Sequence, residues 1–226
     1  MSAAIVADAE ALALPQRPRL RGWIHLWSFA ISVVACTTLV LAAATVSTQA
    51  ALATAVYGVT VVGMFGVSAL YHRRTWPTPT SRALMRRLDH SMIFLFIAGT
   101  YTPAAVLAMS PRTGAIVLAV VWTGALIGVA LKLGWPRASR WLGVPIYLAL
   151  GWVAAFVLPD LLARAGVVAL VLLLVGGGLY TAGAVGYALQ RPRGWPQTFG
   201  YHEFFHAATA LAATCHYVAV WLVVLQ

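Results

Sequence analysis

Two histidines near the C-terminus are spaced as ligands of one metal ion would be. His202 and His206 are the ends of the segment His-Glu-Phe-Phe-His. Side chains four residues apart lie on the same face of a helix, so both imidazoles can reach one ion. A histidine pair with this spacing is a well-known zinc-binding arrangement. The segment therefore predicts part of a zinc site.

Three further polar residues can complete this site. Ser68 and His72 are again four residues apart, and Asp89 comes soon after them. His72 could supply a third nitrogen and leave the fourth tetrahedral position to water, as in catalytic zinc sites. Asp89 could hold that water or orient a ligand, and Ser68 could contact the same water. We therefore expect the three histidines to bind Zn²⁺, with Asp89 and Ser68 as the catalytic residues.

The composition predicts that a membrane-spanning domain positions these residues. Of the 226 residues, 62% are hydrophobic and only 9% are charged, whereas soluble domains are about 25% charged. The apolar residues form blocks of about the length that a bilayer requires. We predict an all-α integral membrane protein, a bundle of seven transmembrane helices. The predicted spans are Gly22–Val46, Ala50–His72, Leu88–Ala108, Thr113–Leu133, Trp141–Leu158, Gly166–Leu189 and Gly200–Leu225.

The distribution of basic residues predicts which way the spans run. Thirteen Lys and Arg residues lie in the N-terminal segment and every second loop, and only Arg112 and Arg164 lie in the others. Because Lys and Arg favour cytoplasmic loops, we predict a cytoplasmic N-terminus and an external C-terminus. Residues 1–19 are then a short cytoplasmic tail, and residues 20–226 a single transmembrane domain. This orientation brings the serine, the aspartate and the three histidines to one leaflet.

Charge and cysteine content exclude other classes of protein. A net charge of +10 would suggest nucleic-acid binding in a soluble chain. Here the charge follows the loops between spans, so we expect no nucleic-acid partner. Cys36 and Cys215 both lie inside apolar blocks, which argues against a disulfide framework or a cysteine zinc site.

The segment at the start of the last span also matches the H-E-x-x-H motif of metalloproteases, with Glu203 as general base. That interpretation needs a third protein ligand. The histidine that follows, His216, lies about 15 Å further along the same helix. His72 is the better third ligand, and Glu203, rotated about 100° from His202 on the helix, is then expected to face water.

The remaining histidines have simpler expected roles. His25 lies beside Trp23 and Trp27, which places it at the membrane interface. His216 is deep in the last span, where an interhelical hydrogen bond is its expected role. His90 is rotated by about 100° from the preceding aspartate, so we do not expect it to bind the metal.

At these residues the sequence resembles the progestin and adipoQ receptor superfamily, and most closely its bacterial hemolysin III branch. The family pattern is S-x-x-x-H, a later aspartate, and H-x-x-x-H in the last span. The resemblance extends over residues 20–226 and implies a seven-helix bundle with zinc near the cytoplasmic surface. By similarity the three histidines bind the zinc, and the serine and aspartate hold its water. The matching segments are Ser68–His72, Leu88–Ser91 with Ala98–Pro103, and Tyr201–His206.

The resemblance also implies a function. Eukaryotic relatives are lipid-linked receptors to which ceramidase-like hydrolysis is attributed, so we expect a zinc-dependent hydrolase of a lipid amide or ester. Membrane lipids are the expected partners, and the bacterial inner (cytoplasmic) membrane is the expected location. Two alternatives remain open: a non-enzymatic sensor or pore-forming, haemolytic protein with a structural zinc, and an intramembrane H-E-x-x-H metalloprotease.

Overall fold

The computed structural model describes residues 18–135, 140–195 and 197–226, and most of the predicted N-terminal tail lies outside these ranges. The described chain is helical, with one isolated β-bridge between Trp195 and Phe199 and no sheet within those ranges. This confirms the all-α fold class. The elements are α2 (Trp23–Val46), α3 (Thr48–Arg73), α4 (Pro79–Leu107), α5 (Pro111–Gly134), α6 (Arg140–Gly151), the 3-10 helix η1 (Trp152–Val157), α7 (Leu158–Leu189) and α8 (Tyr201–Val224).

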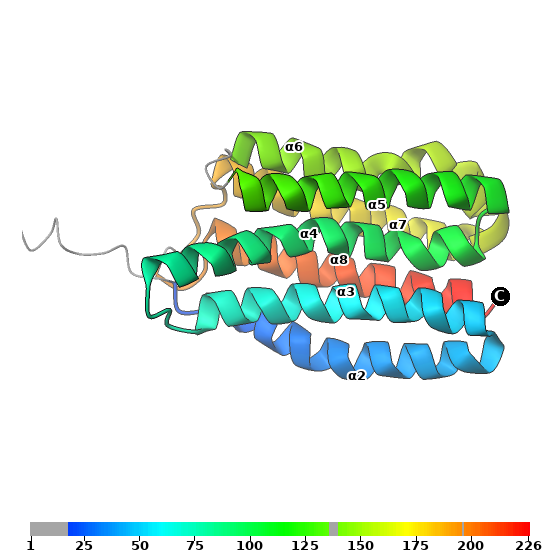
Figure 1. Cartoon of the computed structure of the whole chain (residues 1–226), viewed down its shortest axis with the longest axis horizontal. Helices are drawn as coiled ribbons and strands as arrows, with labels where there is room; N and C mark the ends of the chain where they lie inside the picture. The colour runs from blue at the N-terminus through cyan, green and yellow to red at the C-terminus, as the bar shows by residue number, and fades with distance from the viewer. Residues whose placement is uncertain (1–17, 136–139, 196) are drawn as a thin grey trace, which may run out of the picture.

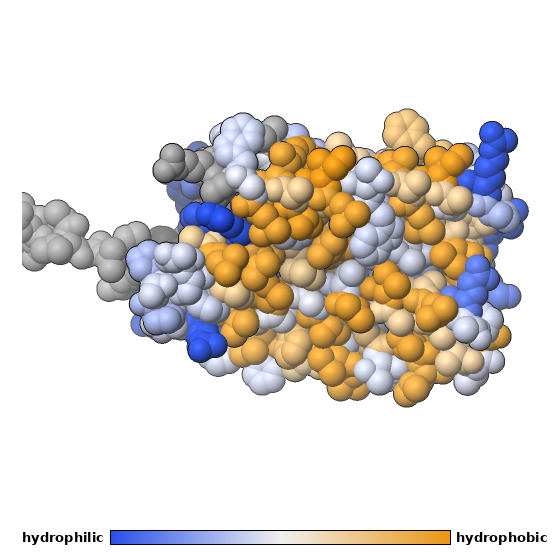
Figure 2. All heavy atoms as spheres, viewed as in Figure 1, coloured by the Kyte–Doolittle hydropathy of each residue, from blue (hydrophilic) through white to orange (hydrophobic). Residues whose placement is uncertain are grey.

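The outer surface of the bundle is suited to lipid. Six helical stretches within the described residues are long and apolar enough to cross a membrane. Figure 2 shows apolar side chains along the visible face and hydrophilic ones at its two ends. Large hydrophobic side chains such as Ile31, Val59 and Phe156 are more than 60% exposed. In water that exposure would be unfavourable, so the chain is a multi-pass membrane protein.

One of the six stretches, Gly143–Leu189, doubles back on itself. It contains α6, η1 and α7. Val144 near its start shares a buried cluster with Ala184 near its end, although forty residues of straight helix would separate them by about 60 Å. The Trp152 indole also donates a hydrogen bond to Thr181 Oγ1 at 3.0 Å. The sequence predicts two spans in this region, and the total of seven membrane crossings remains a prediction.

Ten basic residues whose side chains the structure describes lie at one end of the bundle, which we call the basic end. Here α2, α4 and α8 begin and α3, α5 and α7 finish, whereas the C-terminus lies at the opposite end (Figure 1). Arg112 and Arg164 belong to that opposite end. We predict from the positive-inside rule that the basic end is cytoplasmic. The basic residues with described side chains at this end are Arg19, Arg21, Arg73, Arg74, Arg82, Arg86, Arg87, Lys132, Arg191 and Arg193.

Three helices form the centre of the bundle. The apolar windows of α3, α4 and α8 are 44–56% buried, whereas those of the other candidate spans are 22–28% buried. Polar side chains in a membrane protein are placed away from lipid, against other helices. The predicted site residues all lie on these three central helices, which is the arrangement that burial of polar groups requires.

Close contact between α3 and α4 gives a testable consequence. A Cβ atom on Gly99 would overlap the side chain of Thr60 on the facing helix. We expect Gly99→Ala to destabilise the protein by about 1–3 kcal/mol, because overpacking a tight contact forces the helices apart. Thermal unfolding in detergent measures the effect. Gly178→Ala is the matched control, since nothing lies within 4 Å of its added Cβ; an equal loss in both variants would contradict this explanation.

Candidate metal centre

The start of α8 is held by ionic and backbone contacts that fix the direction of its first turn. Glu203 accepts a hydrogen bond from the Gly200 amide at 2.8 Å, which satisfies a backbone donor at the helix N-terminus. The same carboxylate forms an ion pair with Arg21, from the segment before α2. Glu203 is only 1% exposed. The prediction that this glutamate faces water is therefore wrong.

With α8 fixed in this way, two of its imidazoles meet a third from α3. His202 Nε2 lies 3.1 Å from His72 Nε2, and the ring of His206 lies 5.1 Å from that of His72. One nitrogen from each of the three histidines falls within 4.8 Å of the others. His72 and His206 are 8% and 2% exposed. The structure thus brings together the three histidines that the sequence selects.

The donor set of this group fits zinc. Zn²⁺ takes nitrogen ligands at about 2.0–2.1 Å in a tetrahedron, which separates two ligand nitrogens by roughly 3.3 Å. The 3.1 Å between His72 Nε2 and His202 Nε2 is close to that value. Three neutral imidazoles leave a fourth position open, the number of protein ligands found in catalytic sites.

Asp89 and Ser68 lie beside the three histidines. The Asp89 carboxylate is 3.8 Å from His72 Nε2 and 3.7 Å from His90 Nδ1, and its side chain is 12% exposed. Ser68 is buried one turn before His72, and it lines the interior of the bundle together with Asp89. An acceptor and a hydroxyl thus stand next to the donor nitrogens, where a carboxylate could take a proton.

His25 belongs to this cluster, although the sequence suggested an interfacial position for it. The residue is 2% exposed, and its ring stacks on that of His206 with 3.7 Å between centroids and 7° between planes. Its Nδ1 lies 2.8 Å from the Ser68 hydroxyl. The sequence signal for this role was a histidine within one helical turn of the basic end. The neighbouring Trp23 and Trp27 instead favoured a position at the membrane interface. His25 holds both a predicted ligand and a predicted catalytic residue in place.

Of the other two histidines, His216 makes the interhelical hydrogen bond that the sequence predicts. His90 Nδ1 lies 2.7 Å from the Arg86 carbonyl of its own helix, and it is not part of the three-histidine group. His216 Nε2 lies 3.2 Å from the Leu173 carbonyl, an interhelical hydrogen bond between α8 and α7. Cys36 and Cys215 are both free thiols, as predicted.

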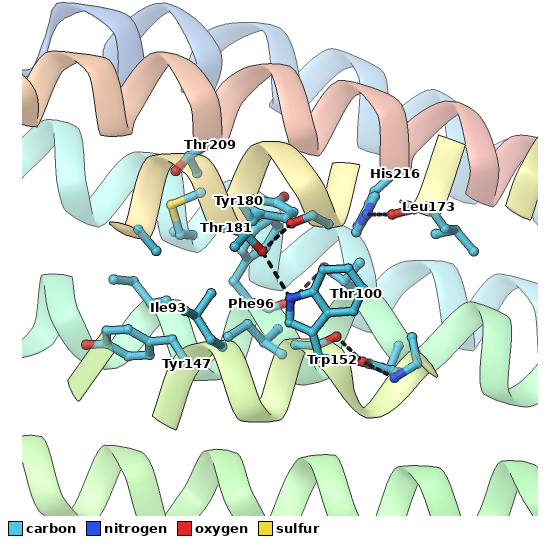
Figure 3. A pocket seen from close by; sticks show the side chains of 18 of the residues that line it. Ile93, Phe96, Thr100, Tyr147, Trp152, Leu173, Tyr180, Thr181, Thr209 and His216 are labelled. Atoms are coloured by element: carbon cyan, nitrogen blue, oxygen red, sulfur yellow. Dashed lines mark hydrogen bonds between the residues drawn. The ribbon is translucent and has the colours of Figure 1, made fainter. Parts of the chain in front are cut away.

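An interior cavity of about 180 Å³ extends from the histidine cluster into the bundle. Its lining comes from several helices, and most of it is apolar (Figure 3). Asp89, His202 and His206 line one part of this cavity, and His216 lines another. In Figure 3, Ile93 and Phe96 line it from α4 and Tyr180 from α7. Such cavities accommodate apolar ligands, whose orientation is set by a few polar groups.

These features define a class of protein: a multi-pass helical membrane protein with a buried three-histidine group that could hold a metal ion. Comparison with protein families gives the particular family. The model described as "Haemolysin-III related" matches residues 14–217. The chain therefore belongs to the haemolysin-III related family, as the sequence motifs indicated.

Two proteins illustrate the relationship. The hemolysin-3 homolog of Bacillus subtilis (strain 168) is 28% identical over 152 residues, which cover 67% of this chain and 68% of that protein. Hemolysin-3 of Bacillus cereus is 34% identical over 137 residues, which cover 61% of this chain and 62% of that protein. Both alignments leave about a third of each chain unmatched.

Proposed function

We propose that this protein is a zinc-dependent membrane hydrolase that cleaves a lipid amide or ester, in the manner of a ceramidase. The observation that carries the proposal is the convergence of three histidine nitrogens within 4.8 Å, with the Asp89 carboxylate 3.8 Å from one of them. Both features adjoin an apolar cavity. A metal site, a proton acceptor and a place for an apolar chain are the parts that hydrolysis of a lipid requires.

His72, His202 and His206 would hold the metal. When bound, zinc supplies Lewis acidity that polarises a carbonyl and makes water a stronger acid. Asp89 would accept the proton of the attacking water at Oδ2 and return it to the leaving group. Ser68, fixed by His25 through a 2.8 Å contact, would keep that carboxylate oriented.

The cavity would bind the acyl part of the substrate and keep bulk water from the reaction. Its lining residues Ile93, Phe96 and Leu173 are apolar, and burial of a hydrocarbon chain is favourable by about 25 cal/mol per Å². Binding energy gained there, away from the reacting carbonyl, can position the scissile bond. The protein would thus use the interior cavity as its substrate site.

The basic end would face the cytoplasm of a bacterial cell. Basic residues gather at this end, and Arg21 lines the same cavity as His72 and His202. By the positive-inside rule the N-terminus is then cytoplasmic and the C-terminus external, with seven spans between them. We place the protein in the inner membrane, where the site would open toward the cytoplasmic leaflet.

A non-enzymatic sensor or pore-former with a structural zinc is the second candidate. The relatives in Bacillus carry the name hemolysin-3, and a structural site would use a fourth protein ligand. The third candidate, an H-E-x-x-H metalloprotease, needs a free general base at Glu203. That carboxylate is instead engaged by Arg21 and by the Gly200 amide, which disfavours a protease.

Turnover by the purified protein tests the proposal. We expect the zinc-loaded wild type in detergent to release fatty acid from a ceramide or an acyl ester, and a chelator to stop the release. Re-addition of zinc should restore it. Equal rates with and without metal would contradict a zinc-dependent mechanism, and no cleavage across a panel of lipid amides and esters would support the non-enzymatic candidate instead.

A further inference from the structure

A second cavity lies at the basic end beside His72 and His202, and we call it the vestibule. Its volume is about 300 Å³. Its lining includes His72 and His202, together with aromatic side chains. The distinctive feature of the vestibule is a set of five basic side chains: Arg21, Arg82, Arg86, Arg87 and Lys132.

These basic side chains come from separate parts of the chain and converge on one opening. Arg21 precedes α2, Arg82 and Arg86 lie one turn apart on α4, and Lys132 ends α5. The positive-inside rule explains basic residues at this end, but it does not explain their convergence on a cavity. Other basic residues of the same end lie elsewhere; Arg73, for example, stacks over Trp23.

Few acidic groups offset this charge. Glu203 is paired with Arg21. Asp160 is held at the opposite end of the bundle, where it accepts a hydrogen bond from the Ser110 amide. Within the described residues this leaves Asp89 as the one other acidic side chain close to the vestibule. The Arg87 Nε atom, moreover, is buried without a hydrogen-bond partner.

The vestibule adjoins the interior cavity. The two share lining residues, namely His90, Val144, Tyr147, Tyr187 and His202. One compartment is therefore strongly basic and the other mainly apolar, with the metal-binding histidines at their junction. A ligand that fills both compartments must carry an anionic head on an apolar chain.

We propose that the protein binds an anionic amphiphile, with a phosphate group in the vestibule and its hydrocarbon chain in the interior cavity. Arginine is suited to this role because its planar guanidinium group binds phosphate through two parallel hydrogen bonds. The proposal rests on the proposed function, since it names the class of lipid offered to the hydrolytic site. A phosphorylated lipid amide or ester fits both compartments, whereas a neutral lipid offers the basic side chains no anionic group.

Binding can be tested separately from turnover. We suggest hexadecyl phosphate and hexadecanol as matched probes, which share the chain and differ in the head, and neither can be hydrolysed as an amide or ester. Apparent affinities come from thermal-shift titrations of the purified protein in a neutral detergent. We expect hexadecyl phosphate to bind at least about tenfold more tightly than hexadecanol, as one or two charge-assisted hydrogen bonds would give.

Matched variants assign the effect to the vestibule. Arg82→Gln/Arg86→Gln should remove the preference for hexadecyl phosphate, whereas Arg191→Gln/Arg193→Gln removes the same charge from the basic end, outside the vestibule, and should keep it. Zinc content is measured in each sample, so that binding of phosphate to the metal is not mistaken for binding to arginine. Equal affinity for the two probes, or equal losses in the two double variants, would overturn the proposal.

Inorganic phosphate distinguishes the sources of the anion. If it fails to displace hexadecyl phosphate at millimolar concentration, the vestibule recognises a lipid headgroup; this is the result we expect. If inorganic phosphate displaces hexadecyl phosphate at the same concentration at which hexadecyl phosphate saturates the protein, a lipid ligand is contradicted. If the protein shows the predicted probe preference but no hydrolysis, the proposed function is contradicted and this inference is still supported.

Discussion

Replacing His202 and His206 together with alanine is expected to abolish zinc binding by the purified protein. The double variant removes two of the three nitrogens that converge within 4.8 Å, and one remaining imidazole cannot hold the ion against buffer. Elemental analysis of protein purified without added chelator measures the number of zinc ions per chain. We expect about one zinc per wild-type chain and a value near the background for the variant, with lipid hydrolysis lost in parallel.

The control for this variant is another histidine of the same helix. His216 bonds to the Leu173 carbonyl, away from the cluster, so His216→Ala should keep full zinc content. Folding is checked by size-exclusion profile and helical circular dichroism. A folded double variant that keeps stoichiometric zinc would show that the metal is bound elsewhere.

Asp89→Asn is expected to lower the turnover number for lipid hydrolysis by about 10²–10⁴-fold, the usual contribution of a general base. The amide keeps the shape of the carboxylate but cannot accept a proton in the same way. Because Asp89 is 3.8 Å from His72 Nε2 and lies outside the three-histidine group, zinc content should be unchanged. Steady-state kinetics and elemental analysis of the same sample separate the two effects.

The matched control here is Asp160→Asn, at the opposite end of the bundle, where the carboxylate bonds to the Ser110 amide. Its turnover should stay within about twofold of wild type, because it is remote from the cluster. If Asp89→Asn loses zinc in proportion to activity, the aspartate is a fourth ligand and the site is closed, as in structural zinc sites. That outcome would favour the non-enzymatic candidate.

The histidine cluster could be predicted because the local spacing of the histidines and the small number of ionisable residues in the spans both indicate it. Helix geometry places His202 and His206 on one face whatever the rest of the fold does. In a chain with only five acidic residues, a polar residue inside a span is conspicuous, which is how Asp89 and His72 were found. The orientation rule then brought separate segments to the same end without any knowledge of the packing.

What the sequence could not give is the set of lateral contacts between helices. The stacking of His25 on His206 depends on which face of α2 meets α8. All faces of α2 are similarly hydrophobic, because its lipid and protein neighbours are both apolar. The sequence therefore does not show which face packs against α8. The ion pair between Arg21 and Glu203 joins residues 182 positions apart. Neither contact has a signature at short range.

The region of α6 and α7 shows a related limit of pattern reading. Two apolar blocks predict two spans, but the structure has a short α6, the 3-10 helix η1, and a left-handed backbone conformation at Gly166 within α7. Glycine adopts that conformation without the steric cost that a Cβ imposes. Hydropathy identifies how long an apolar segment is, but it does not locate a break in a helix such as the one at Gly166. The helix boundaries inside this region therefore come from the structure.

The most direct test of the account is X-ray absorption at the zinc edge of the purified wild-type protein. We predict a zinc signal whose nearest shell fits three imidazole nitrogens at about 2.0–2.1 Å and one further light atom. Loss of the imidazole scattering in the His202→Ala/His206→Ala variant would assign it to the cluster. Absence of zinc from the wild type, or a shell dominated by sulfur at about 2.3 Å, would contradict a histidine metal centre.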